Sequence, residues 1–203
     1  MKKYSLKNVT KKFSVYVILV GLASCQNNTD NNSVAKINVV KDTIQSEEET
    51  IKRGEYLVTT LGCGDCHSPK KINEHGIPYQ DPELMLSGHP QNLVITDYDK
   101  QTSKNWVLFN MHNTAVVGPW GTSYAANITS DATGIGNWTE EQFFKAMKEG
   151  KFKGIDGTRP LMPPMPWQNY SSMTHEDLHS IFLFLKSTKP ISNIVPSYQP
   201  PVQ

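Results

Sequence analysis

The sequence predicts an all-α domain in which three main helices are joined by long loops. Apolar residues recur at helical spacing in three segments, which lie within residues 47–62, 139–150 and 174–190. A Cys-x-x-Cys-His motif at residues 63–67 directly follows the first of them. Residues 68–136 are instead rich in glycine, proline, asparagine and aspartate, so we expect mainly loops there, with a short hairpin at most.

The first predicted helix carries one stripe of apolar residues and glycine, formed by Ile51, Gly54, Val58 and Leu61. Glycine inside a helix costs roughly 1 kcal/mol relative to alanine. Its presence in the stripe is understandable if a second helix crosses closely over it. We therefore expect a helix crossing at Gly54.

Capping residues mark the ends of the other two helices. Thr139 and Gln142 form a capping box at the start of the second helix, and Gly150 is placed to end it. Thr174 caps the third helix and Pro190 closes it. The predicted buried residues of the two helices are Phe143, Ala146 and Met147, and Leu178, Ile181, Phe182 and Leu185.

The N-terminus has the pattern of an export signal, with a basic start and an apolar stretch too short to span a membrane comfortably. The stretch ends in Leu22-Ala23-Ser24-Cys25, which resembles the lipobox of bacterial lipoproteins. Cys25 is therefore expected to carry lipid, although an ordinary signal peptide with a chance cysteine is the alternative. The predicted order is a lipoprotein signal peptide at 1–24, a flexible polar tether at 25–46, a folded domain at 47–190 and a proline-rich tail at 191–203.

The charge of the exported chain limits its partners. Loss of the five lysines in residues 1–24 would change the formal net charge from +1 to −4. Nucleic acid is excluded as a partner, because its binding needs a basic footprint. The expected location is the bacterial cell envelope, facing the periplasm and anchored through Cys25. Gln26 follows that cysteine and is not the aspartate that retains some lipoproteins at the inner membrane, so the outer membrane is favoured over the inner.

The Cys-x-x-Cys-His motif indicates covalent attachment of one haem. Cys63 and Cys66 lie three residues apart and can reach the two vinyl groups as thioethers, while His67 lies beneath the iron. Zinc is an alternative, but it needs a second ligand pair. His175 and His179 could form half a site, yet they fall on the predicted polar side of a helix and are expected to be solvated. Dithiol redox chemistry would need a strand before the motif, where the sequence predicts a helix.

Four stretches of the chain resemble a known family. The chain is similar to class I c-type cytochromes, and more narrowly to the cytochrome modules associated with membrane dehydrogenases for alcohols, aldehydes and sugar acids. Those modules often occur as two or three haem domains in one chain, whereas this chain has one haem motif. The resemblance implies a cytochrome c-like fold, with three main helices around a covalently bound haem and long loop insertions. The stretches are Arg53-Gly54-x-Tyr56-Leu57, Asn127-Ile128-Thr129-x-Asp131-x-Thr133-Gly134-Ile135-Gly136-x-Trp138, Met165-Pro166-Trp167-x-x-Tyr170 and Asp177-Leu178-x-x-Ile181-Phe182-x-Phe184-Leu185.

The same resemblance implies that a methionine in the loop before the last helix is the sixth iron ligand. Met165 matches the Met-Pro-aromatic pattern of the family, and Met162 is the alternative. Prolines on both sides of Met165 stiffen this loop. Either methionine could instead fill a gap in the core. The remaining ligand candidates are His75, His89 and His112, each of which also reads as an ordinary surface or loop histidine.

Several further residues have possible roles at the haem or in the helix packing. Asn127, Thr129 and Arg159 could bind the propionates, although Arg159 could equally be a solvated charge. Trp138, Trp167 and Tyr170 could line the ring or pack in the core. Tyr56 and Phe182 are expected to touch where the first and last helices cross.

These features predict an electron carrier and not a catalytic enzyme. The expected function is electron transfer by a membrane-anchored mono-haem c-type cytochrome, between an exported dehydrogenase or membrane complex and a respiratory partner. The alternative is a haem enzyme or gas sensor, such as a peroxidase-like module, with an open distal site. A third possibility is a docking subunit that is inert without its dehydrogenase. Its haem chemistry would be the same as that of the carrier.

Overall fold

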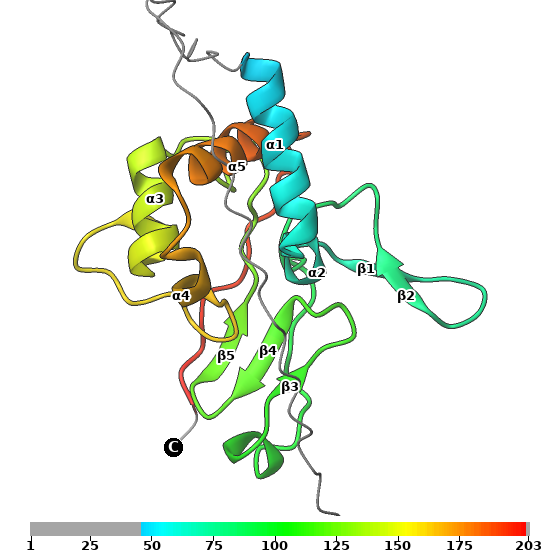
Figure 1. Cartoon of the computed structure of the whole chain (residues 1–203). Helices are drawn as coiled ribbons and strands as arrows, with labels where there is room; N and C mark the ends of the chain where they lie inside the picture. Colours follow the sequence, from blue (N-terminus) through cyan, green and yellow to red (C-terminus); the bar gives the residue numbers. More distant parts are fainter. Residues whose placement is uncertain (1–45, 202–203) are drawn as a thin grey trace, which may run out of the picture. The chain divides into compact units, whose positions relative to one another are not determined.

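The computed structural model describes residues 46–201, in which short strands lie between two N-terminal helices and three later helices, and an extended tail follows the last helix (Figure 1). The α-helices are α1 (Glu47–Thr60), α2 (Cys63–His67), α3 (Glu140–Glu149), α4 (Trp167–Tyr170) and α5 (His175–Ser187). The strands are β1 (Lys70–Ile72), β2 (Pro78–Gln80), β3 (Leu108–Phe109), β4 (Ala115–Gly118) and β5 (Gly121–Tyr124), and two 3-10 turns are η1 (Thr102–Lys104) and η2 (Phe152–Gly154). The predicted signal, the lipidated Cys25 and nearly all of the tether lie outside these residues. Between residues 46 and 201, no helix is both long and apolar enough to cross a membrane.

The expectation of an all-α fold is wrong. The strands form two antiparallel sheets, one of β1 and β2 and one in the order β3-β4-β5. In the second sheet Val116 pairs with Ser123 and Val117 pairs with Thr122. All four residues of β4 are buried, so the strand lacks the alternation of apolar and polar residues by which a half-exposed strand is recognised.

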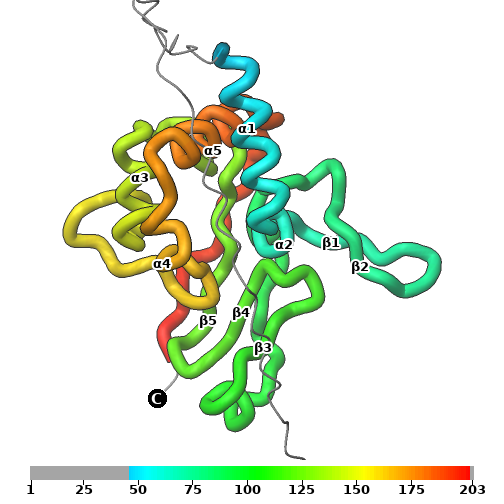
Figure 2. Tube along the Cα trace, in the orientation of Figure 1, coloured from blue at the N-terminus to red at the C-terminus, as the bar shows by residue number. Residues whose placement is uncertain are grey.

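The predicted crossing at Gly54 is confirmed, and the helix that crosses is α5 (Figure 2). A Cβ atom at Gly54 would lie 2.0 Å from the Ser180 carbonyl oxygen and 2.7 Å from the Phe184 Cβ. The expected contact between Tyr56 and Phe182 is wrong. Tyr56 is 58% exposed, and the Phe182 ring lies 5.5 Å from the ring of Phe143.

Most helix ends lie where the capping residues predict them. Thr139 and Gln142 form the capping box of α3, and Gly150 is its left-handed C-cap. The Thr174 side chain caps α5 by accepting a hydrogen bond from the Asp177 N–H. The stripe of α1 is partly different, because the helix ends at Thr60 and leaves Leu61 exposed. The buried residues of α1 are Gly54, Leu57 and Val58.

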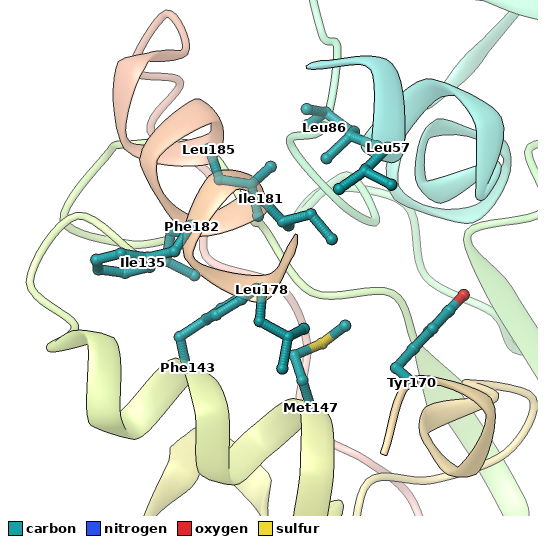
Figure 3. Close-up of a cluster of buried hydrophobic side chains, with 11 residues drawn as sticks. Leu57, Leu86, Ile135, Phe143, Met147, Tyr170, Leu178, Ile181, Phe182 and Leu185 are labelled. Carbon is teal, nitrogen blue, oxygen red and sulfur yellow. The ribbon is translucent and has the colours of Figure 1, made fainter. Parts of the chain in front are cut away.

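The core lies between α1, α3 and α5 (Figure 3). The predicted faces of α3 and α5 are buried in it, and Leu178 is fully enclosed. Leu86 and Ile135, from the loop region, are also buried there, so this region contributes to the apolar core.

The C-terminal tail is extended, as expected, and it is tied to the loop region. Asn193 is buried, and its Nδ2 donates to the carbonyls of Ser87 at 2.7 Å and His89 at 2.9 Å. Further along, Gln199 exchanges two backbone bonds with Thr122 of β5, at 2.8 and 3.0 Å. The loops and the tail therefore pack on each other as well as on the helices.

His89 gives the fold a pH dependence. Its side chain is fully buried, its Nε2 donates to the Leu93 carbonyl at 2.7 Å, and its Nδ1 accepts from the Thr114 hydroxyl at 2.9 Å. Burial lowers the pKa of His89 below its usual value, so the folded protein holds the neutral ring. The contribution of His89 to the free energy of unfolding is complete above about pH 6.5, the usual pKa of histidine in an unfolded chain. It is lost as the pH falls through the lower pKa that His89 has in the folded protein.

We expect the urea midpoint to fall between pH 7 and pH 5, and to fall less in His89→Gln. Glutamine keeps a donor and an acceptor but does not titrate. An equal fall in both proteins would show that His89 is not the group responsible.

Candidate haem site

One helical turn presents both cysteines and the histidine of the motif. Gly62 adopts a left-handed conformation, with φ 68° and ψ 28°, where the chain passes from α1 into α2. Cys63 and Cys66 then lie at positions i and i+3 of α2, and His67 is its last residue. Both cysteines are free thiols and are half-buried.

The ring of His67 is oriented by a backbone carbonyl. Its Nδ1 lies 2.7 Å from the oxygen of Ala126. Because a carbonyl only accepts, Nδ1 carries the proton and the lone pair of Nε2 is available to a metal. Burial lowers the pKa of His67, against the opposing effect of the Ala126 bond, and so favours the neutral ring that a metal needs.

Two loop segments hold the Ala126 carbonyl in place. The backbone N–H of His89 donates to Ala125 at 2.9 Å, and that of Ile128 donates to Leu86 at 2.9 Å. Gly88 lies so close that a Cβ there would be 2.5 Å from the carbonyl carbon of Ala126. The Gly88 N–H also donates to the His67 carbonyl at 2.8 Å, so this loop contacts both residues of the hydrogen bond between His67 and Ala126.

The thiols of the motif are protonated at neutral pH. Burial raises the pKa of Cys63 to about 11, and burial together with Asp65 raises the pKa of Cys66. Dithiol redox motifs work through a lowered thiol pKa. The raised pKa values, and the helix that precedes the motif, therefore favour thioether attachment over dithiol chemistry.

The loop region contains a short hairpin, which the sequence analysis allowed for, and this hairpin of β1 and β2 packs against α2. The Lys70 ammonium donates to the carbonyls of Asp65 and Ser68, both at 2.8 Å, and lies 3.3 Å from the carbonyl of Gly64. From the other strand, Gln80 Nε2 donates to Asp65 Oδ1 at 3.1 Å. A lysine shortly after a helix end is a known way to satisfy its last carbonyls, so Lys70 was detectable in the sequence.

The methionine loop brings Met165 to the same cluster as the motif. Met165 and Cys63 are both half-buried and both pack against the apolar core, whereas Met162 is not among the residues packed there. The Met165 N–H donates to the Met162 carbonyl at 3.3 Å. This position supports Met165 over Met162 as an iron ligand, and the assignment stays a prediction.

The aromatic residues of the resemblance lie at different places. Tyr170 is buried in the core, with its hydroxyl directed away from α4 (Figure 3). Its pKa is raised by burial and by the nearby Cys63 and Cys66, which puts the phenol on their side of the core. Trp138 packs against the same core. The indole of Trp167 instead covers the end of α3, where a Cβ at Gly150 would be 2.3 Å from the ring.

The residues considered for the propionates already have protein partners. Asn127 donates to Ile191 at 2.8 Å and accepts from the Thr129 hydroxyl at 2.8 Å, which ties its loop to the tail. The Arg159 guanidinium lies 3.8 Å from the centre of the Phe152 ring and donates to the Pro160 carbonyl at 2.9 Å. Their assignment to propionates stays a prediction that these contacts do not support.

The other histidines are engaged elsewhere. His75 is exposed beside Glu74, and both ring nitrogens of His89 are hydrogen-bonded within the protein. His112 Nδ1 accepts from the backbone of Lys70 at 3.0 Å.

His175 and His179 were expected to be solvated, but both contact α3. The ring of His175 lies edge-on to Phe144, and His179 Nδ1 is 2.5 Å from Glu140 Oε1. In the described part of the chain, no three or more His, Cys, Asp or Glu side chains are grouped to hold a metal ion.

The donor set fits a c-type haem. Two neutral thiols lie one turn apart, an imidazole has its Nε2 lone pair available, and a thioether from another loop packs against the same apolar cluster. These are the groups that covalent attachment and Met/His axial ligation require.

Comparison with known proteins finds similarity to cytochrome subunits of dehydrogenases. No family model matches the chain. It is 38% identical over 142 residues to the cytochrome c subunit of a quinone-dependent alcohol dehydrogenase from Komagataeibacter europaeus, covering 70% of this chain and 25% of that protein. It is 29% identical over 154 residues to the fructose dehydrogenase cytochrome subunit of Gluconobacter japonicus, covering 75% and 24% respectively. The gluconate 2-dehydrogenase cytochrome c subunit of Pantoea cypripedii is also 29% identical, over 150 residues. The chain spans about a quarter of the length of these relatives, and the similarity supports a cytochrome c-like module.

We expect haem to remain on the chain after acid-acetone extraction, because thioether bonds do not dissociate. The double substitution of Cys63 and Cys66 by alanine should remove the haem-stained band from a denaturing gel, whereas Cys25→Ala should retain it. Haem that leaves the wild-type chain in acid-acetone would contradict covalent attachment.

Proposed function

We propose that this cytochrome c-like module transfers single electrons, as a mono-haem c-type cytochrome. The observation that carries the proposal is the 2.7 Å bond from His67 Nδ1 to Ala126, beside two neutral thiols on the same turn. That bond leaves Nε2 as the donor of an oriented, neutral imidazole. Similarity to cytochrome subunits of dehydrogenases supports the same reading.

Each residue of the site has a distinct task in this proposal. Cys63 and Cys66 would hold the haem covalently, so that it could not dissociate. His67 and Met165 would both bind the iron, which would leave no position for substrate. The bound haem supplies an iron that gains and loses one electron, and a thioether ligand favours its reduced state.

We further propose that the redox partner is a dehydrogenase. The relatives are named as cytochrome subunits of fructose, alcohol and gluconate dehydrogenases. A module similar to part of each would accept electrons from such an enzyme and pass them to a respiratory partner. In this role the chain carries electrons and catalyses no reaction of its own.

The proposed location rests on the N-terminal sequence. Residues 1–24 direct export, lipid on Cys25 anchors the chain, and the polar residues up to 46 act as a tether. The module then faces the periplasm of a bacterial envelope, with the outer membrane favoured over the inner.

The lipid anchor predicts where the protein fractionates. Cys25→Ala should move the haem protein from the membrane fraction to the soluble fraction, without loss of haem staining. A variant that stays in the membrane fraction after a salt wash would show that Cys25 is not the anchor.

The distal ligand separates a carrier from a haem enzyme or gas sensor. Ferric wild-type protein should show the weak far-red absorption band of methionine-ligated haem, and ferrous protein should resist carbon monoxide. Met165→Ala should abolish the band, admit carbon monoxide and lower the reduction potential, because the sulfur ligand that favours reduced iron is lost.

Met162→Ala is the matched control and should keep the band. If Met162→Ala removes the band and Met165→Ala does not, the ligand is Met162. Rapid carbon monoxide binding by the wild type would instead favour the open-site alternative.

A further inference from the structure

The methionine loop makes few backbone hydrogen bonds of its own, although its prolines restrict the backbone. Pro163, Pro164 and Pro166 have no backbone N–H to donate. The bond from the Met165 N–H to the Met162 carbonyl is long, at 3.3 Å. The position of Met165 therefore depends on contacts between this loop and the rest of the protein.

Both ends of the loop are attached to the end of α3. The Leu161 N–H donates to the Gly150 carbonyl at 2.6 Å, and the Trp167 indole packs directly on Gly150. Between these two points, the Pro163 carbonyl accepts a hydrogen bond of 2.5 Å from the hydroxyl of Ser123. Ser123 belongs to β5 and is buried, so this middle contact comes from the sheet.

The Ser123 hydroxyl also accepts a hydrogen bond from Trp120. The indole Nε1 lies 3.3 Å from Ser123 Oγ and only donates, so the serine oxygen accepts from it. The serine proton then goes to Pro163 at 2.5 Å in preference to Val116, whose carbonyl is 3.3 Å away. The ring of Trp120 is itself fixed over Gly118, where a Cβ would lie 2.6 Å from it. The chain of donors therefore runs from the indole through the hydroxyl to the methionine loop.

We infer that Ser123 is a positioning residue for the methionine ligand, and that the β3-β4-β5 sheet supports the distal side of the haem. This inference rests on the proposed function, because it requires Met165 on the iron. Loss of the Ser123 hydroxyl leaves the Pro163 carbonyl without its donor, and the loop then releases Met165 more often. The loop stays attached at both ends, so the haem protein still forms.

The experiment compares Ser123→Ala and Ser123→Thr with the control Ser180→Ala in the full-length haem protein. Ser180 is also a buried serine, but it donates to the Glu176 carbonyl within α5, away from the loop. Three quantities are measured: the far-red band of the ferric protein, the pH at which it disappears, and the rate of carbon monoxide binding to the ferrous protein.

The loss of one hydrogen bond should change the population of open loop by about three- to tenfold. Ser123→Ala should therefore bind carbon monoxide about three- to tenfold faster than the wild type and lose its far-red band at lower pH. Ser123→Thr, which keeps the hydroxyl, and Ser180→Ala should both behave as the wild type. Should Ser123→Ala yield no haem protein, Trp120→Phe removes the indole N–H that donates to Ser123 and keeps an aromatic side chain, and a shift in the same direction is expected.

Different results would contradict the role of Ser123 and the ligation by Met165. If the wild type shows the band and Ser123→Ala matches Ser180→Ala in all three measurements, the positioning role of Ser123 is overturned and the proposed function stands. If the wild type itself lacks the band and binds carbon monoxide at once, Met165 ligation is wrong and the inference fails with it.

Discussion

The close crossing of α1 and α5 at Gly54 is the constraint on which the rest of the structure depends. A Cβ at this position would lie 2.0 Å from the Ser180 carbonyl oxygen, so any other residue would force the two helices apart. The chain passes from α1 into the turn that carries Cys63 and His67, and it reaches α5 from the loop that carries Met165 through the short helix α4. A single close packing contact therefore relates the two parts of the proposed haem site to each other.

Neutral donors suit the apolar surroundings of that site. Burying a charge without a partner is costly, and both thiols and the imidazole are held in their uncharged forms. Three groups outside the main helices form hydrogen bonds to the site. The Ala126 carbonyl accepts from His67, the Lys70 ammonium donates to a carbonyl of α2, and the Ser123 hydroxyl donates to the methionine loop. The region between α2 and α3 thus supplies hydrogen bonds both to the Cys-x-x-Cys-His motif and to the methionine loop.

Local signals in the sequence predicted the three long helices and the motif, because these depend on residues close together in the chain. The capping box at Thr139 and the glycine at the α5 crossing are examples. Strand β4 was missed because every one of its residues is buried, which removes the alternating pattern. The roles of His89 and Asn127 were not predictable, because their partners lie in distant segments that only the fold brings near. Leu61 was wrongly placed in the core because a left-handed Gly62 turns the chain after Thr60.

The central claim is that this chain carries one covalent haem and exchanges one electron at a time through a closed iron. A spectroelectrochemical titration of the purified full-length protein, with haem and protein quantified in the same sample, tests it most directly. The account predicts one haem per chain and a single reversible transition with the slope of a one-electron couple, unchanged when carbon monoxide is present. A chain without haem, two separate transitions, or a transition that shifts with carbon monoxide would contradict it.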